Sequence, residues 1–260
     1  MKNALITGGS SGIGFAIAQR LIEEGNWNVI SVSRSREKID HALALMPQIE
    51  NKIEFLVCDV GDAQQCNRLY DMVKERFDAL HGLVNNAGML SSGGLVGLDP
   101  AQWTKTLEVN LSGPYFVTKA LLPLLKNAKG ASVINISSIA SKIPGRSIAY
   151  SVSKAGLDMF TEFLAGELGP MQIRVNSINP GLVETNLHLD SGVYQNTSDY
   201  LAMLQDALAK YPLARLGKPH DIASLARFLL SDESLWITGA IIKIDGGVSV
   251  FNELLSHERG

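Results

Sequence analysis

The chain has 260 residues, of which 46% are hydrophobic and 19% are charged, and its formal net charge is −3. This composition is typical of a globular protein with a sizeable core and excludes an intrinsically disordered chain. The mild acidity argues against a nucleic-acid surface, and the apolar runs are too short to span a membrane. The two cysteines, Cys58 and Cys66, are too few for a disulfide framework, so we expect a reduced, cytoplasmic protein.

Short β-branched runs alternate with helical patterns along nearly the whole chain. The predicted strands are 4–7, 28–33, 53–57, 82–85, 132–137, 174–178 and 241–244. The predicted helices are 14–24, 62–77, 100–126, 150–168 and 221–230. We expect Pro123 to kink or tighten the end of the long helix 100–126. The alternation predicts an α/β fold, a doubly wound parallel sheet with helices on both faces. Since no linker-like stretch divides the chain, we predict a single domain over residues 1–260.

A glycine-rich turn joins the first predicted strand to the first predicted helix. The sequence Thr7-Gly8-Gly9-Ser10-Ser11-Gly12-Ile13-Gly14 has the spacing G-x-x-x-G-x-G. Glycines allow a tight turn and a close approach of the backbone to a pyrophosphate, which also meets free N–H groups at the helix N-terminus. An ordinary turn between a strand and a helix is the alternative. The turn lacks the Lys-Ser/Thr pair of a nucleotide-hydrolysing P-loop.

The end of the second predicted strand favours NADP(H) over NAD(H). An Asp or Glu at this point would bind the ribose 2′-hydroxyl of NAD, but this chain has Ser33, followed by Arg34 and then Arg36. A carboxylate would repel a 2′-phosphate, whereas a small hydroxyl beside a guanidinium group accepts one. The missing acid is the stronger half of this inference, because Arg34 is alternatively a solvated surface charge.

Tyr150 and Lys154 lie one helical turn apart. A free phenol has a pKa of about 10, and a neighbouring ammonium group lowers that pKa, so the tyrosine can exchange protons near neutral pH. An exposed Tyr/Lys pair at this spacing is common, but here Ser137 and Ser138 end a predicted strand, where such sheets bind ligands. Asn110 lies within a predicted apolar helix and is either a core amide or the holder of a proton-relaying water.

Taken in order, these motifs resemble those of the short-chain dehydrogenase/reductase family, in the single-domain branch of the 3-oxoacyl-acyl-carrier-protein reductases. The matching residues are Thr7-Gly8-x-x-x-Gly12-x-Gly14, Asp59-Val60, Asn85-Asn86-Ala87-Gly88, Asn110, Ser137-Ser138, Tyr150-x-x-x-Lys154, Asn179-Pro180-Gly181-x-x-x-Thr185 and Asp245-Gly246-Gly247. The resemblance implies a Rossmann-type, seven-stranded sheet and hydride transfer between a nicotinamide and a carbonyl or secondary alcohol carbon of a small or acyl substrate. It also implies a homo-oligomer, either a tetramer or a dimer.

The resemblance further implies a role for individual residues. Tyr150 becomes the general acid/base, and Lys154 lowers its pKa and holds the nicotinamide ribose. Ser138 orients the substrate oxygen and Asn110 completes a proton relay. Ser137 has the family's spacing to the tyrosine, but Ser138 has its local register, and we prefer Ser138. The implied cofactor-binding residues are Gly8, Ser10, Ser11, Gly12, Ile13, Gly14, Ser33, Arg34, Asp59, Val60, Asn86, Ala87, Gly88, Tyr150, Lys154, Pro180, Gly181, Val183 and Thr185.

The segment 186–211 starts polar and ends in an amphipathic run, which predicts either a lid over the site or a surface excursion, and we prefer the lid. Together with 91–96 and 142–147 it should form the substrate pocket, where Lys142 and Arg146 are more simply exposed cations. The apolar residues Met159, Phe160, Phe163 and Leu164 either form a subunit interface or belong to the core.

Other functions compete with an oxidoreductase. An epimerase or dehydratase of the longer branch of the family shares the Tyr150/Lys154 pair, but it needs a longer chain and the spacing G-x-x-G-x-x-G, which this sequence lacks. A dinucleotide-binding scaffold or sensor without turnover would share the fold, but it has no chemical reason to keep Tyr150, Lys154, Ser138 and Asn110 together. A metal-dependent enzyme is disfavoured because the five histidines are scattered without ligand spacing.

Overall fold

The computed structural model describes residues 1–45, 52–145, 147–187 and 196–251. In this part of the chain one parallel sheet contains seven strands in the order β3-β2-β1-β4-β5-β6-β7. The strands are β1 (Lys2–Thr7), β2 (Trp27–Ser33), β3 (Ile53–Val57), β4 (Gly82–Asn85), β5 (Ser132–Ile136), β6 (Arg174–Pro180) and β7 (Ile241–Ile244). The predicted Rossmann-type sheet is confirmed.

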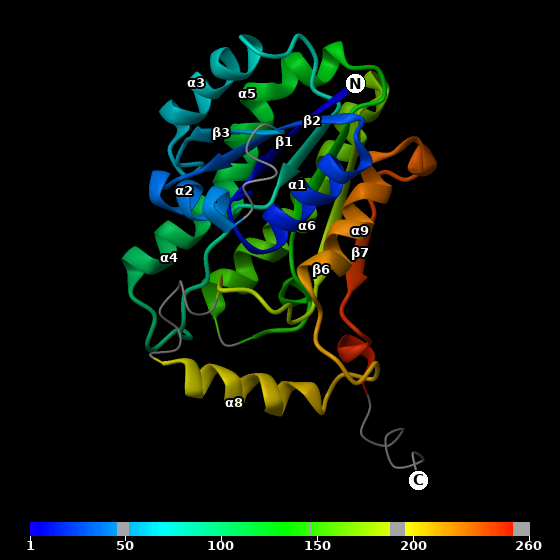
Figure 1. The fold of residues 1–260 in the computed structure, drawn as a ribbon. Helices are drawn as coiled ribbons and strands as arrows, with labels where there is room; N and C mark the ends of the chain where they lie inside the picture. The colour runs from blue at the N-terminus through cyan, green and yellow to red at the C-terminus, as the bar shows by residue number, and fades with distance from the viewer. Residues whose placement is uncertain (46–51, 146, 188–195, 252–260) are drawn as a thin grey trace.

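Helices cover both faces of the sheet (Figure 1). They are α1 (Gly12–Glu24), α2 (Arg36–Leu45), α3 (Ala63–Lys74), α4 (Pro100–Leu107), α5 (Gly113–Asn127), α6 (Ile148–Leu168), α8 (Thr197–Leu208) and α9 (Pro219–Leu230). One hydrophobic cluster lies between the sheet and α3, α5 and α6, and the other lies between the sheet and α1 and α9. Within the described residues no helix is long and apolar enough to cross a membrane.

The segment expected to form one long helix over 100–126 is interrupted near its middle and not at Pro123. The segment Glu108–Ser112 between α4 and α5 is π-helical, whereas Pro123 lies inside α5, which continues to Asn127. The helix therefore continues past the proline, and the expected kink or tightening at Pro123 stays a prediction. A π-helical turn holds one residue more than an α-helical turn and often marks a functional site. Here it contains the buried Asn110.

Of the four apolar residues of α6 that the sequence assigned either to the core or to a subunit interface, two belong to the core and two are exposed. Leu164 is buried and Phe160 is partly buried against the core. Met159 and Phe163 are 64% and 68% exposed, so they form an apolar surface rather than core.

Successive strands are added on one side of β1 up to β3 and on its other side from β4 onward. Strand β1 pairs with β2 on one side and with β4 on the other. In open α/β sheets such a switch point leaves a crevice beyond the carboxyl ends of the strands, where ligands bind. The glycine-rich turn after β1 lies at this point.

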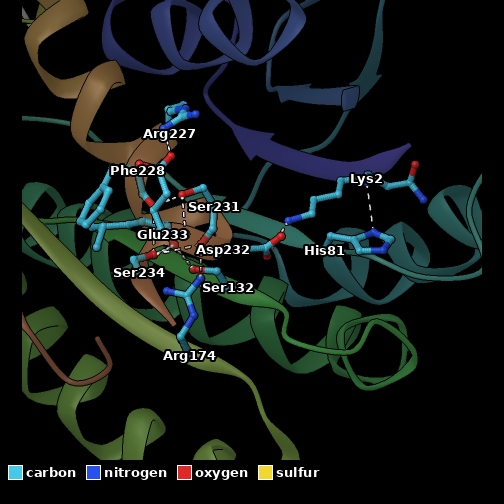
Figure 2. Close-up of polar contacts among 12 residues, drawn as sticks. Lys2, His81, Ser132, Arg174, Arg227, Phe228, Ser231, Asp232, Glu233 and Ser234 are labelled. Carbon is cyan, nitrogen blue, oxygen red and sulfur yellow. Dashed lines mark hydrogen bonds and ion pairs between the residues drawn. The ribbon is translucent and has the colours of Figure 1, made fainter. Parts of the chain in front are cut away.

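Polar contacts join the amino ends of the strands, opposite the crevice, to neighbouring segments (Figure 2). Lys2 Nζ pairs with Asp232 at 2.8 Å, and Ser132 Oγ donates to the Leu229 carbonyl at 2.8 Å. The Arg174 guanidinium group donates to the Ser231 carbonyl at 3.2 Å. These contacts fasten the first residues of β1, β5 and β6 to the end of α9 and the turn that follows it. They occupy the amino edge of the sheet, whereas the crevice lies at the carboxyl edge.

Replacing Leu121 with alanine should lower the free energy of unfolding by about 3 kcal/mol. The Leu121 side chain is fully buried in α5, so its loss removes apolar contacts and leaves a cavity. Leu95→Ala is the matched control because Leu95 is 88% exposed. Denaturant unfolding measures both, and equal stabilities would contradict the described core.

Candidate active site

A cavity of about 900 Å³ opens at the carboxyl edge of the sheet. Its walls include the turn after β1, the ends of β2, β3, β4, β5 and β6, the start of α6 and one face of α8. All the predicted catalytic and cofactor-binding residues line it except Gly14 and Asn110. The volume lies at the upper end of the range typical for small-molecule and cofactor sites.

The turn after β1 leaves no room for larger side chains. Gly8 has a φ of 67°, and a Cβ atom there would lie 2.9 Å from Asn86 Nδ2. A Cβ atom on Gly14 would lie 2.5 Å from the Gly8 carbonyl oxygen. Gly14 therefore acts behind the cavity wall by letting α1 approach the turn. This tight cradle at a helix N-terminus fits the pyrophosphate of a dinucleotide.

The loop after β4 is fastened to the same turn. Thr7 Oγ1 accepts hydrogen bonds from the backbone N–H groups of Asn86 and Ala87, each at 3.0 Å. In return, Asn86 Nδ2 donates to the Thr7 carbonyl at 2.9 Å and to the Gly8 carbonyl at 3.2 Å. The two sides of the crevice are thus held at a constant separation.

The end of β2 presents hydroxyls and cations to the cavity. Ser33 is buried, and its Oγ lies 3.0 Å from Ser10 Oγ in the glycine-rich turn. Arg34 is exposed and lines the cavity, as does Lys38, which the sequence analysis missed. Arg36 instead pairs with Asp40 at 2.9 Å and does not line the cavity. Of the two arginines noted in the sequence, Arg34 therefore faces the cavity, whereas Arg36 forms an ion pair within α2.

Tyr150 enters the cavity from the first turn of α6. This helix starts at the right residue because Ser147 Oγ caps it by accepting from the Tyr150 backbone N–H at 3.2 Å. Burial raises the pKa of the Tyr150 phenol, and a hydrogen bond with the Ser138 side chain opposes that rise. The phenol is therefore protonated at neutral pH.

Lys154 lies beneath the tyrosine. Its Nζ is 5.6 Å from the centroid of the Tyr150 ring and donates to the Ile136 carbonyl at 2.8 Å. Burial lowers the pKa of Lys154 to about 8, and the negative charge of Asp158 works in the opposite direction. Burial and the Ser138 hydrogen bond are the influences on the pKa of Tyr150 that the structure resolves, so the lowering of that pKa by Lys154 stays a prediction.

The structure separates the two serines at the end of β5. Ser138 faces the tyrosine, and its Oγ accepts from the Ala140 backbone N–H at 3.1 Å. Ser137 Oγ instead donates to the Lys154 carbonyl at 3.2 Å. Ser137 thus supports α6, while Ser138 carries the hydroxyl next to the phenol.

Asn110 lies behind the cavity wall, fully buried. Its Nδ2 donates to the Met89 carbonyl at 2.9 Å and to Ser153 Oγ at 3.2 Å, and its Oδ1 accepts from the Met89 backbone N–H at 2.8 Å. Both amide hydrogens are used, so this side chain clamps the loop after β4, and the holding of a proton-relaying water by Asn110 stays a prediction.

One face of α8 lines the cavity. In the ribbon this helix lies apart from the sheet (Figure 1). Residues at helical spacing line the cavity, namely Asp199, Ala202, Met203, Asp206, Ala207 and Lys210. The amphipathic run within 186–211 indicated this segment, but the pattern did not predict which of its charged residues face the cavity. Ser91, Ser92, Gly145 and Ser147 also line the cavity, whereas Lys142 is exposed and does not. Arg146 and residues 188–195 lie outside the described residues.

Comparisons with known proteins agree with this geometry. The family model described as "Enoyl-(Acyl carrier protein) reductase" matches residues 8–249. "Dehydrogenase/reductase SDR family member 4" of Pongo abelii is 35% identical over 252 residues, which cover 95% of this chain and 87% of that protein. The chain belongs to the short-chain dehydrogenase/reductase family.

Two further relatives extend the comparison. The 3-oxoacyl-(acyl-carrier-protein) reductase FabG of Thermotoga maritima is 34% identical, over 96% of this chain and 98% of that protein. The solved active-site complex of Pseudomonas aeruginosa RhlG with NADP has a TM-score of 0.85 and 31% identity, over 95% of this chain and 96% of that one. As a member of the short-chain dehydrogenase/reductase family, the chain is an oxidoreductase that uses a nicotinamide dinucleotide. The glycine cradle and the size of the cavity fit such a cofactor.

The stability of the cofactor-free protein should rise with pH between about 8 and 10.5, relative to a Lys154→Met variant. In this window the unfolded chain binds a proton at residue 154 that the folded protein has released, so increasing pH favours the folded state. The gain should reach at most about 3 kcal/mol. Denaturant unfolding at a series of pH values measures the difference, and a difference that is constant with pH would contradict the depressed pKa.

Proposed function

We propose that this protein is an NADP(H)-dependent reductase and dehydrogenase for a carbonyl or secondary alcohol carbon, with Tyr150 as the general acid/base. The observation that carries the proposal is the placement of the Tyr150 phenol, the Ser138 hydroxyl and the Lys154 ammonium group in one wall of a dinucleotide-sized cavity. Their pairing supports proton transfer at an oxygen atom of a bound substrate.

In the reducing direction the side chains divide the work as follows. The bound dinucleotide supplies the hydride. The Tyr150 phenol donates its proton to the substrate oxygen, which the raised pKa permits at neutral pH. Ser138 orients that oxygen through its hydroxyl. Lys154 places a positive charge under the tyrosine ring and stabilises the phenolate that forms.

The role of Asn110 in this scheme is positional. Its amide holds both backbone groups of Met89, next to the cavity-lining Gly88. We propose that it shapes the cofactor channel after β4, alongside the relay expected from the family resemblance.

Preference for NADP(H) rests on the end of β2. The strand ends in Ser33 and not in a carboxylate, and the Ser33 hydroxyl with Arg34 provides a polar, cationic site for a 2′-phosphate. The relatives support the same cofactor, since RhlG has been solved as a complex with NADP. We therefore propose that Arg34 binds the phosphate.

Arg34→Ala should weaken NADPH binding about tenfold while leaving NADH binding nearly unchanged. The guanidinium group contacts only the extra phosphate, so only the phosphorylated cofactor loses an interaction. Arg36→Ala is the matched control, because Arg36 pairs with Asp40. Quenching of cofactor fluorescence measures the affinities, and equal binding of NADH and NADPH by the unaltered protein would refute the proposed preference.

Substrates enter the part of the cavity beneath α8. We propose that residues 186–211 form a lid within one domain of residues 1–260, and that the inner face of α8 contacts the substrate. FabG and the other relatives support a small or acyl carbonyl compound as the substrate class.

Tyr150→Phe should abolish NADPH oxidation in the presence of carbonyl compounds and leave NADPH affinity unchanged. The phenylalanine keeps the ring over Lys154 but has no proton to donate. A panel of ketones and 3-oxoacyl thioesters, followed by absorbance of NADPH, measures turnover. Normal turnover of the variant would remove Tyr150 from its role, and binding without any turnover by the unaltered protein would favour a non-catalytic scaffold or sensor.

The exposed apolar side chains of α6 support a homo-oligomer, either a tetramer or a dimer. Met159 and Phe163 leave an exposed apolar surface on the described chain. Tyr115 of α5, whose ring packs edge-on against Phe160 of α6, is 44% exposed. Both cysteines are free thiols, in keeping with the proposed cytoplasmic location.

A further inference from the structure

Asp158 is a buried carboxylate for which the proposed reaction has no use. It lies on α6 one turn after Lys154, and only 3% of it is exposed. Burying a carboxylate is strongly unfavourable unless hydrogen bonds or an opposite charge compensate for the hydration that it loses. A side chain at such a place therefore needs strong partners.

Those partners lie at the end of β6. Asp158 Oδ2 accepts from Asn179 Nδ2 at 2.9 Å, and Asp158 Oδ1 lies 3.1 Å from the donating Ser177 hydroxyl. The same hydroxyl is 2.8 Å from Asn179 Oδ1. The three side chains form a closed polar group that fastens α6 to the carboxyl end of β6.

This group reaches the active site through Asn179. In addition to Asp158, Asn179 Nδ2 donates to the Ser138 carbonyl and to Ser141 Oγ, each at 3.0 Å. The backbone of Ser138 is therefore held by an amide that the Asp158 carboxylate holds in turn. Because the Ser138 hydroxyl contacts Tyr150, its position depends on this chain of contacts.

Asp158 also acts on Lys154 through its charge. The groups around the Lys154 ammonium include Tyr150 on its own helix, the Ile136 carbonyl of β5 and, one turn on, Asp158, and Gly88 of the loop after β4 also lies beside it. Among the described residues, Asp158 is the charged group that shifts the pKa of Lys154, and it raises that pKa against burial. Without it, less of the lysine would be protonated at neutral pH.

We propose that Asp158 is a positioning residue, which holds Ser138 in place through Asn179 and keeps Lys154 in its charged form. The inference rests on the proposed function for the consequences in catalysis. The hydrogen bonds and the charge make two separate contributions, which different variants can separate.

Asp158→Asn removes the charge and keeps the size of the side chain. It should lower the pKa of Lys154 by about one pH unit and move the alkaline limb of kcat/KM for carbonyl reduction to lower pH by the same amount. Ser177→Ala is the matched control, because it removes one hydrogen bond from Asp158 and leaves the charge. It should leave the pKa of Lys154 where it is.

Asn179→Ala removes the bridge to Ser138 and leaves the Asp158 charge. It should lower kcat about tenfold with little change in the affinity for NADPH and with no shift of the alkaline limb. Asp158→Glu, which retains the charge, should keep the alkaline limb and serves if Asp158→Asn fails to fold. Circular dichroism and NADPH fluorescence establish that each variant is folded.

Carbon NMR of protein labelled at the lysine side chains, with Lys154 assigned from Lys154→Arg, measures the pKa of Lys154 without any substrate. An unchanged pKa in Asp158→Asn, or loss of the protonated lysine in Asp158→Glu, would overturn the charge contribution. An unchanged kcat in Asn179→Ala would overturn the positioning of Ser138. If the unaltered protein reduces no carbonyl compound, the proposed function fails, while the NMR titration still decides the action of Asp158 on Lys154.

Discussion

The Lys154 ammonium group is buried, and burial disfavours its charge. The arrangement of the cavity wall depends on the groups that compensate for this loss of hydration. The Ile136 carbonyl accepts one of its hydrogens, the Tyr150 ring lies above it and the Asp158 carboxylate lies one helical turn away. Each of these partners belongs to an element that ends or begins at the carboxyl edge of the sheet. Compensating for this loss therefore fixes α6 against β5 and places the phenol in the cavity.

The other wall of the crevice is built from backbone groups that lie close together. Gly8 and Gly14 admit no Cβ atom without a clash, and Thr7 and Asn86 exchange hydrogen bonds across the switch point. This wall carries no catalytic side chain. It supplies shape and N–H groups, which suit a pyrophosphate, while the α6 wall supplies the groups that handle a proton.

The contrast between Ser137 and Ser138 illustrates the limit of reasoning along the chain. In the sequence, the spacing to the tyrosine favours Ser137 and the local register favours Ser138. The two residues are consecutive, so what distinguishes them is the direction of their side chains. The strand ends at Ile136, and the following turn sends Ser137 toward α6 and Ser138 toward Tyr150. Similarly, Arg34 and Arg36 look alike in the sequence, but only Arg34 lines the cavity because α2 has begun and pairs Arg36 with Asp40.

The local pattern determined that the sheet is parallel and doubly wound, the succession of strands and helices along the chain, the glycine-rich turn and the Tyr150/Lys154 pair. These features depend on apolar periodicity, on glycine and on residues four apart in one helix, all of which act over a few neighbouring residues. The helix α2 escaped prediction because its buried face consists of little more than Ile39 and Ala42. Only the tertiary structure decided the π-helical turn at Asn110, the cavity face of α8 and the link from Asp158 through Asn179 to Ser138. Those features join residues far apart in the chain, and their hydrogen bonds exist only after the helices have packed on the sheet.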